Sequence, residues 1–166
     1  MRQKRRRKTF ILNNDNNKII SAGGALIYKI ENNNPFLLLI NINNKYEDLG
    51  GKVDNDDTNI YDTVTREIYE ESNGLVYNNI KTRLMNSPHV YISHSKYLLF
   101  ITQAILTESH LKKEDFGDKE IHDNIARTID WIPINDFLDN DTISKKLNPR
   151  LKNKFLFKII SDLNNI

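Results

Sequence analysis

The stretch TREIYEESNGLV, residues Thr65–Val76, crowds Glu67, Glu70 and Glu71 onto little more than one helical turn and then closes with Asn-Gly. Upstream of it, aliphatic residues recur four apart, which is the spacing of one helical face. They are Ile60, Val64 and Ile68. We therefore predict a helix from about Thr58, with Asp57 or Thr58 as its N-cap and Gly74 closing its far end.

The three glutamates do not lie on the solvent side of this helix. At about 100° per residue, Glu71 falls inside the aliphatic stripe, and Glu67 and Glu70 flank its edge. Like charges so placed repel, and burial makes the repulsion worse, so they require raised pKa values, partners or a cation. Hard carboxylate oxygens suit Mg²⁺ or Mn²⁺. A solvated acidic face is the alternative interpretation of the short stretch alone.

The residues that precede the three glutamates support a bound cation. The sequence Gly50-Gly51-Lys52 precedes the helix after an apolar run, and glycines permit a tight loop whose carbonyl groups approach a metal. Arg66 adjoins the glutamates and is able to hold one carboxylate through a bidentate bond. The sequence thus predicts a metal site between this loop and the helix.

The segment Gly51–Leu75 resembles the Nudix box, G-x5-E-x7-R-E-U-x-E-E-x-G-U, where U is a bulky aliphatic residue. Gly51 matches the first glycine and Gly74-Leu75 match the last pair. The core of the box is matched without a gap by Arg66, Glu67, Ile68, Glu70 and Glu71. SAGGALIYK, beginning at Ser21, resembles the first core strand of the family, so the likeness extends from Ser21 to Trp131.

Two positions depart from the box. Asp57 stands where the first glutamate is expected, eight residues rather than seven before Arg66. Ser72 and Asn73 stand where the pattern has a single residue. Both extra residues lie at helix ends, where cap loops absorb an insertion, so we expect the site to be intact and the role of Asp57 to be the open point.

The resemblance implies a Nudix-type α/β/α sandwich with a mixed β-sheet, and hydrolysis of a nucleoside diphosphate linked to another moiety. It implies that Glu67, Glu70, Glu71 and the carbonyl group of Gly50 or Gly51 bind Mg²⁺ or Mn²⁺ or activate water, and that Arg66 orients a glutamate. Which glutamate is the base stays open. Family members often add an acid from a loop before the last core strand. Here we choose Glu120, ahead of Glu114, Asp115 and Glu108.

The rest of the chain is consistent with a single domain of 166 residues. We expect a basic, polar and flexible tail over residues 1–17 and the hydrolase domain over residues 18–166. Further strands are expected over residues 19–30, 36–42, 74–84, 89–94, 96–106 and 127–134. A second helix is expected after Asn148 and Pro149, with one apolar face. That face comprises Leu151, Phe155, Ile159 and Leu163.

Composition excludes several other classes. The chain has no cysteine, which rules out disulfides and thiolate chemistry, and no apolar run approaches the roughly 18 residues of a membrane span. We therefore expect an intracellular, most simply cytoplasmic, protein. The four histidines, His89, His94, His110 and His122, show no metal-ligand spacing. Trp131 is interpreted as a core residue.

The start of the chain bears on the substrate. Residues 2–8 hold six of the 24 Lys and Arg residues and no acid. These residues are Arg2, Lys4, Arg5, Arg6, Arg7 and Lys8. Such a cluster binds nucleic acid, acts as a localisation signal or is merely a solvated leader. Lys52 and Arg83 are further candidates for phosphate contacts.

If the tail contacts RNA, the substrate is a capped mRNA from which m7GDP is released, as in the similar Nudix decapping enzymes of large DNA viruses. The alternatives are free nucleotides, namely ADP-ribose, dinucleoside polyphosphates or oxidised dNTPs, and diphosphoinositol polyphosphates. A non-catalytic RNA-binding module is the alternative from a different class. The expected partner is accordingly a nucleotide or a capped RNA.

Overall fold

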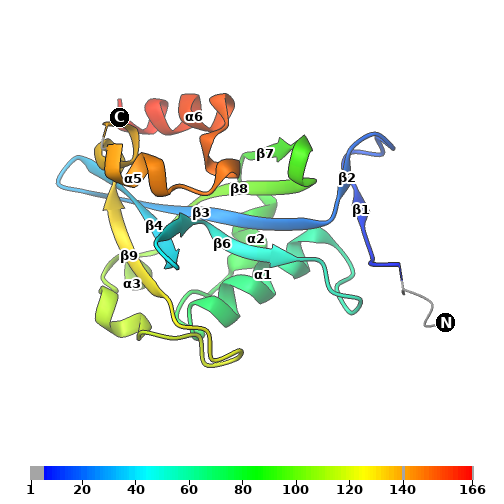
Figure 1. The fold of residues 1–166 in the computed structure, drawn as a ribbon, viewed down its shortest axis with the longest axis horizontal. Helices are drawn as coiled ribbons and strands as arrows, with labels where there is room; N and C mark the ends of the chain where they lie inside the picture. Colours follow the sequence, from blue (N-terminus) through cyan, green and yellow to red (C-terminus); the bar gives the residue numbers. More distant parts are fainter. Residues whose placement is uncertain (1–5, 140, 166) are drawn as a thin grey trace.

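The computed structural model describes residues 6–139 and 141–165 and has a mixed β-sheet at its centre (Figure 1). The strands of the sheet are β3 (Ala22–Glu31), β4 (Asn34–Ile42), β5 (Lys45–Glu47), β6 (Leu49–Lys52), β7 (His89–Ile92), β8 (Tyr97–Gln103) and β9 (Thr128–Pro133). Their order is β5-β4-β3-β8-β7, with β6 paired to β3 and β9 paired to β4. The β3–β8 pair is parallel, and the other pairs are antiparallel.

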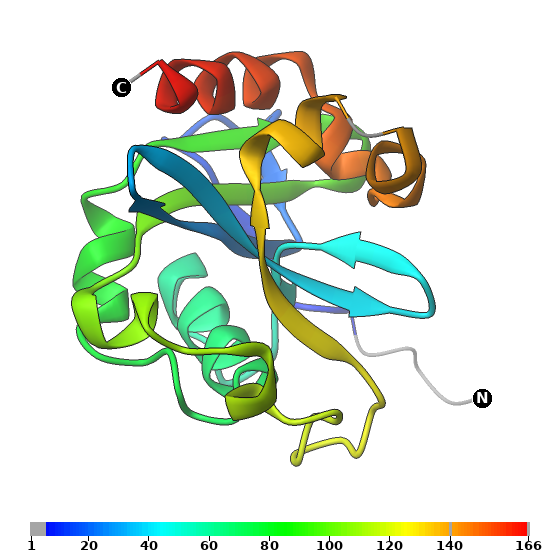
Figure 2. The same cartoon turned by 90° about the vertical axis from the view of Figure 1, so that its left-hand side faces the viewer.

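Helices cover both faces of this sheet. They are α1 (Ile60–Glu71), α2 (Ile80–Met85), α3 (Leu106–Ser109), α4 (Ile134–Asp139), α5 (Asp141–Lys146) and α6 (Lys154–Asn164), with short 3₁₀ turns η1 (Ser93–Ser95), η2 (Lys113–Phe116) and η3 (Pro149–Lys152). Figures 1 and 2 show α6 on one side of the sheet and α1 on the other. The expected α/β/α sandwich with a mixed sheet is thus the observed architecture.

Alternation along the strands builds two cores. In β3, Ala25 and Ile27 pack toward α1, where they meet Val64, while Leu26 packs with Leu156 of α6 on the opposite face. Because strand side chains alternate between faces, one apolar run supplies both layers. The helix α1 is therefore seated on the sheet by its aliphatic stripe, which leaves its glutamates at the edge of the buried contact.

Asparagine pairs make the tight turns between the first strands. Glu31 pairs with Asn34 and Ile42 with Lys45, so Asn32–Asn33 and Asn43–Asn44 are two-residue hairpin loops. All four of these residues have φ between 51° and 63°. Two-residue hairpins favour such left-handed angles, which asparagine tolerates better than most residues. These asparagine pairs therefore form the turns between the strands.

The proposed boundary at residue 17 falls inside a small hairpin. Strand β1 (Phe10–Ile11) pairs antiparallel with β2 (Ile19–Ile20). Phe10 and Leu12 pack against the core on the α1 side of the sheet. The chain thus contacts the folded body from Phe10 onward, through the partly buried side chains of Phe10 and Leu12.

The first helix begins slightly later than predicted. Its N-cap is Asn59, whose side chain accepts a hydrogen bond from the backbone N–H of Asp62. Asp57 and Thr58 are therefore not the cap. At the other end, Asn73 and Gly74 adopt left-handed angles, and the Gly74 N–H donates to the Tyr69 carbonyl at 2.8 Å. The helix closes at the Asn-Gly pair as expected.

The strand predicted over residues 74–84 is wrong. This segment is a loop followed by α2, whose N-cap Asn79 has a left-handed φ of 52°. Ile80 and Leu84 are four residues apart and both are buried. Their helical spacing, rather than the β-branched and aromatic content of the segment, decided its conformation.

The second predicted helix is divided in two. Asn148 caps only the short 3₁₀ turn η3, and Asn153 is extended and caps α6 anew through the Phe155 N–H. This break changes the helical phase, so Leu156 and Ile160 are buried while Phe155 is 60% exposed. The predicted apolar face is therefore wrong for Phe155.

Across the described segments, no helix is long and apolar enough to cross a membrane.

Candidate active site

The helix α1 lies against β6, and glycines make this close approach possible. Gly50 and Gly51 of β6 pair with Gly24 and Gly23 of β3. A Cβ atom on Gly51 would lie 2.4 Å from the carboxyl carbon of Glu67. Any side chain at position 51 would therefore displace the Glu67 carboxylate from the strand, so Gly51 provides the space that this carboxylate occupies.

Glu71 is the most deeply buried of the three helix glutamates, with 9% of its surface exposed. Its Oε2 accepts a hydrogen bond of 2.9 Å from the backbone N–H of Gly50. Burial raises the pKa of Glu71 well above its ordinary value, and the nearby charges of Glu67 and Asp48 raise it further. The helical-wheel prediction that Glu71 faces inward is confirmed.

Arg66 is held between two acidic groups. Its Nη1 donates to Glu67 Oε1 at 2.7 Å, and its Nη2 and Nε donate to the two carboxylate oxygens of Asp57 at 3.1 and 3.3 Å. Asp57 also accepts from the hydroxyl of Thr63 at 2.7 Å and from the N–H of Asp54 at 2.8 Å. Burial favours a higher pKa for Asp57, but these hydrogen bonds hold it below its ordinary value. Asp57 thus anchors Arg66, which answers the question left open by the extra residue.

Glu120 joins the helix glutamates from the loop before β9. It is 5% exposed, and burial, Asp123 and Glu70 raise its pKa. Burial also raises the pKa of Glu67, and Glu70 and Glu120 add to this effect. The other loop acids make different contacts: Glu108 pairs with Arg83 and Asp115 bonds the N–H of Lys112. Of the loop acids considered from sequence, Glu120 is therefore the one that lies near the helix glutamates.

Glu67, Glu70, Glu71 and Glu120, named the carboxylate cluster from here on, carry more negative charge than their contacts offset. Arg66 contacts Glu67 at 2.7 Å and Glu70 at 3.6 Å but is shared with Asp57. His122 lies 3.7 Å from Glu70. Within residues 6–139 and 141–165, no three acidic, histidine or cysteine side chains converge closely enough to hold a metal ion as they stand. The available ligand atoms are nevertheless carboxylate oxygens, which suit a hard divalent cation, and Gly51 has no Cβ atom to fill the space beside Glu67.

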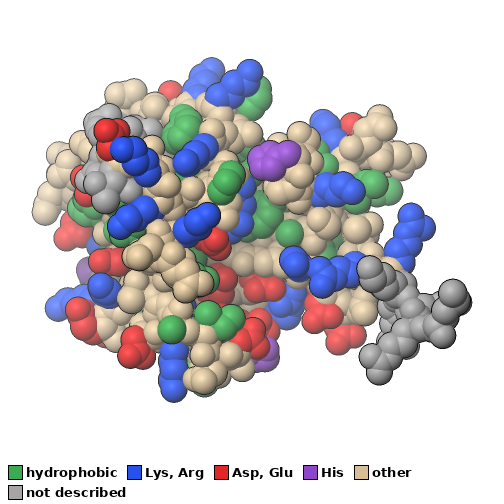
Figure 3. Space-filling view, in the orientation of Figure 1, with side chains coloured by type: hydrophobic (Ala, Val, Ile, Leu, Met, Phe, Trp, Pro, Cys, Tyr) green, Lys and Arg blue, Asp and Glu red, His purple; other side chains and the backbone are tan. Residues whose placement is uncertain are grey.

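The start of the described chain lies beside this cluster. The Nζ of Lys8 donates to the carbonyl groups of Asp57 and, at 3.4 Å, Asn55. Arg7 and Lys52 line a cavity of about 280 Å³ together with Arg66 and Glu67. On the face drawn in Figure 3, acidic side chains gather near the centre with basic side chains beside them. Of the six basic tail residues, Arg2, Lys4 and Arg5 lie outside the described residues.

Arg83, a candidate for phosphate binding, lies apart from the cluster. Both of its terminal nitrogens donate to the buried carboxylate of Glu108 at 2.8 Å, and Nη2 also donates to the carbonyl of Gln103. These contacts join α2 to α3. Arg83 therefore has a structural partner, whereas Lys52 remains exposed at the cavity beside Glu67.

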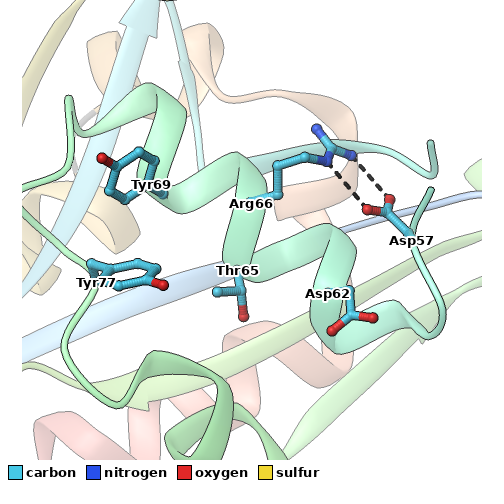
Figure 4. Close-up of a pocket in the computed structure, with 6 residues that line it drawn as sticks. All are labelled: Asp57, Asp62, Thr65, Arg66, Tyr69 and Tyr77. Atoms are coloured by element: carbon cyan, nitrogen blue, oxygen red, sulfur yellow. Dashed lines mark hydrogen bonds and ion pairs between the residues drawn. The ribbon is translucent and has the colours of Figure 1, made fainter.

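The outer face of α1 carries a second, open cavity (Figure 4). Tyr69 and Tyr77 line it, and their rings meet edge to face with centroids 5.0 Å apart. Both rings are about half exposed. Figure 4 also shows the paired Arg66 and Asp57 at this cavity, and Arg66 contacts Glu67 and Glu70 of the carboxylate cluster as well.

The remaining sequence interpretations concern single residues. All four histidines are exposed. Trp131 is partly buried, packs against the core and donates from Nε1 to the carbonyl of Leu111 at 3.1 Å.

Sequence reasoning missed three features around the site. The first is a buried network in which Asp48 binds Tyr97 and Arg150. The others are Asn73 and Arg127, which bond to the loop that carries Glu120. The pairs are 10 to 102 residues apart in the chain, so no local pattern marks them. The only available signal was the extra residue that Ser72-Asn73 introduces into the box.

No family model matches the chain, and no curated protein matches its sequence. Among solved structures, a C. elegans Ap4A hydrolase in a binary complex superposes with a TM-score of 0.53 over 89% of this chain and 99% of that protein, at 16% identity. At that identity the likeness concerns the fold, and it confirms the expected Nudix-type architecture. Two structures of Shewanella oneidensis NrtR, one of them complexed with a 27mer DNA, align less well, each with a TM-score of 0.39. Those alignments cover 75% of this chain and 58% and 57% of NrtR, at 15% and 14% identity.

Proposed function

We propose that this chain is a Nudix-family hydrolase that cleaves a pyrophosphate bond in a nucleoside-diphosphate-linked substrate with Mg²⁺ or Mn²⁺. The observation that carries the proposal is the carboxylate cluster. Four acidic groups gather beside the two glycines of β6, and the pKa values of three of them are raised by burial and mutual repulsion. A divalent cation would stabilise such a site by neutralising its carboxylates, and the bound cation would attract a polyanionic ligand.

Glu67, Glu70, Glu71 and Glu120 would hold the cation. When bound, it would neutralise charge on the pyrophosphate and lower the pKa of the attacking water. One glutamate accepts the proton of that water. Arg66, fixed by Asp57, holds Glu67 in place. Tyr69 and Tyr77 offer exposed rings on which a nucleobase is able to stack.

We propose capped RNA as the substrate, with release of m7GDP. The position of the tail supports this choice, because Lys8 fastens the start of the chain beside the site and Arg7 and Lys52 flank Glu67. These cations suit phosphates on either side of the scissile pyrophosphate. Free nucleotides are the competing substrates, and the Ap4A hydrolase fold favours dinucleoside polyphosphates among them. Diphosphoinositol polyphosphates also suit a basic surface, and an RNA-binding module without activity is the non-enzymatic alternative.

A substrate panel tests both levels of the proposal. The full chain is incubated with Mg²⁺ or Mn²⁺ and, separately, cap-labelled RNA, Ap4A, ADP-ribose and a diphosphoinositol polyphosphate. We expect released m7GDP from the capped RNA, and its loss in Glu70→Gln but not in Glu114→Gln, which removes an exposed loop acid. Hydrolysis of free nucleotides but not of capped RNA would show that free nucleotides are the substrate. RNA binding without hydrolysis of any substrate would show that the protein is not a hydrolase.

The contribution of the tail is tested separately. Arg7→Ala and Lys52→Ala are each expected to raise the KM for RNA and to make that KM less dependent on salt concentration. The KM for Ap4A is expected to rise less. Lys158→Ala, an exposed lysine of α6 on the other face of the sheet, is the control. Equal effects on RNA and Ap4A would show that these cations contact only the phosphates common to both substrates.

A further inference from the structure

Asn73 follows the last turn of α1 in a left-handed conformation, with φ of 54°. Its side-chain amide reaches across to the loop before β9. The Nδ2 group donates to the carbonyl groups of Phe116 and Lys119, both at 3.0 Å, and Oδ1 accepts from the N–H of Ile121 at 2.9 Å. Both amide hydrogens and the amide oxygen are thus used on one loop.

These hydrogen bonds bracket Glu120. They fix the residues directly before and after it, while the N–H of Glu120 itself donates to the carbonyl of Ile125 at 2.8 Å. Hydrogen bonds therefore fix the backbone at Glu120 and at the residues directly before and after it. Its side chain is 5% exposed, and the charge of Glu70 lies near enough to raise its pKa.

Arg127 reinforces the same connection from the start of β9. Its Nη1 donates to the carbonyl groups of Phe116 and Gly117 at 2.9 and 2.8 Å, and its Nη2 donates to the carbonyl of Glu71 at 2.7 Å. Asn73 and Arg127 share Phe116 as a partner. Together they tie the end of α1, which presents Glu70 and Glu71, to the loop that presents Glu120.

Besides Asn73 and Arg127, the loop is held by the buried side chain of Phe116 and by its own backbone hydrogen bonds, from Glu120 to Ile125 and from Arg127 to Asp118. Most of residues 112–126 are exposed, apart from Phe116 and Glu120. An exposed segment of that length gains conformational entropy when its anchors are removed, and a carboxylate on it then no longer keeps one position. The side chain of Asn73 supplies three of these anchors from a single rigid attachment point at the helix end.

We propose that Asn73 is a positioning residue that sets Glu120 against the helix glutamates and thereby completes the cation site. The inference rests on the proposed function and deepens it. It also explains a departure from the box, because Asn73 is one of the two residues that stand where the pattern has one. The additional residue gives the helix end a side chain that reaches the loop.

Glycine at position 73 makes the sharpest test, because it keeps the left-handed backbone and removes only the amide. Asn79→Gly is the matched control, since Asn79 has φ of 52° and its side chain makes no cap hydrogen bond. We expect Asn73→Gly to lower the Mn²⁺ affinity measured by calorimetry, and kcat, by about 10- to 100-fold. KM is expected to change less than kcat, and Asn79→Gly is expected to leave all three unchanged.

A double mutant separates positioning from general weakening. Glu120→Gln alone is expected to reduce Mn²⁺ affinity, and adding Asn73→Gly to it should reduce the affinity no further, because the carboxylate to be positioned is already gone. Losses that multiply in the double mutant, or a normal Mn²⁺ affinity in Asn73→Gly, would overturn the proposal.

Amide hydrogen exchange tests the tether without reference to activity. Asn73→Gly is expected to accelerate exchange at Ile121, whose N–H loses its acceptor, while amides in β8 keep their rates. If the wild-type protein neither binds Mn²⁺ nor hydrolyses any substrate, the proposed function fails by itself. In that event, an exchange rate at Ile121 that is the same in Asn73→Gly and in the wild-type protein would also overturn the proposed tether.

Discussion

Two regions with buried carboxylates meet at β6, and they differ in whether the carboxylate is paired with a cation. Asp48, just before the strand, is fully buried and fully paired: Tyr97 donates to it at 2.5 Å and Arg150 at 2.7 Å. The Arg150 guanidinium also lies over the Tyr97 ring, 4.5 Å from its centroid. Glu71, bonded to Gly50 of the same strand, receives one backbone N–H and no described cation within salt-bridge distance.

The difference separates structure from function. A buried carboxylate with an arginine and a hydroxyl as partners is neutralised within the fold, so it connects η3 to the sheet and needs nothing further. A buried carboxylate among other carboxylates is an electrostatic cost that the fold alone leaves uncorrected. Such a cost is retained where a cation or a reacting group later offsets it. The predictions below use matched substitutions in the two regions.

Glu71→Gln is expected to have the largest effect, and on activity. Glutamine preserves the shape and the acceptor for the Gly50 N–H but removes the charge. We expect pyrophosphate hydrolysis to fall by about 10²- to 10⁴-fold, with stability near neutral pH unchanged or increased because repulsion is relieved. Steady-state kinetics and urea denaturation measure the two quantities. Retained turnover would show that Glu71 is a structural acid like Asp48.

Asp48→Asn makes the same chemical change in the paired region and is expected to act on stability. Removing this charge leaves Arg150 buried without its main partner, and breaking such a pair costs about 3–5 kcal/mol. Urea denaturation of Asp48→Asn and of Glu47→Gln provides the measurement. Glu47 is more exposed and 3.5 Å from Arg150, so its substitution should cost about 1 kcal/mol or less. A mild effect of Asp48→Asn would remove the contrast between the regions.

The pH dependence of stability is the smallest expected effect and sharpens the comparison. Glu67, Glu71 and Glu120 have raised pKa values in the folded protein, so above about pH 4.3 the folded state binds more protons than the unfolded state. Stability therefore falls as pH rises from there through their folded-state pKa values. Asp57 and Asp62, whose pKa values are lowered, act in the opposite sense and only below about pH 4.

Denaturation at several pH values, with and without Mn²⁺, measures this slope. Without the ion, Glu71→Gln should flatten the fall in stability. With Mn²⁺, stability should instead rise with pH, because the ion binds the deprotonated carboxylates of the folded state. If the dependence of stability on pH is the same in Glu71→Gln and in the wild-type protein, the pKa of Glu71 is not raised in the folded protein.

Periodicity and local motifs predicted the parts of the site that lie on one element. The inward direction of Glu71 followed from its place among Ile60, Val64 and Ile68, and the helix end followed from Asn73-Gly74. The strand expected over residues 74–84 failed because aromatic and β-branched residues occur in both conformations, whereas the buried residues Ile80 and Leu84 have the spacing of a helix. The face of the last helix failed at Phe155 because a second cap at Asn153 changed its phase.

The sequence by itself determined β3, β4, β7, β8 and β9, the acidic helix and its glycine-rich approach, because each depends on residues within a few positions of one another. The strand β6 forms where the sequence predicted a loop at Gly50-Gly51-Lys52. Tertiary structure decided that Asp57 anchors Arg66, that Arg150 neutralises Asp48, and that Glu120 rather than Glu108 approaches the helix glutamates. The partners of Arg150 and Glu120 are distant along the chain and are brought together only by the folded sheet. Whether a buried charge is compensated depends on such distant neighbours, and that balance distinguishes the two acidic regions.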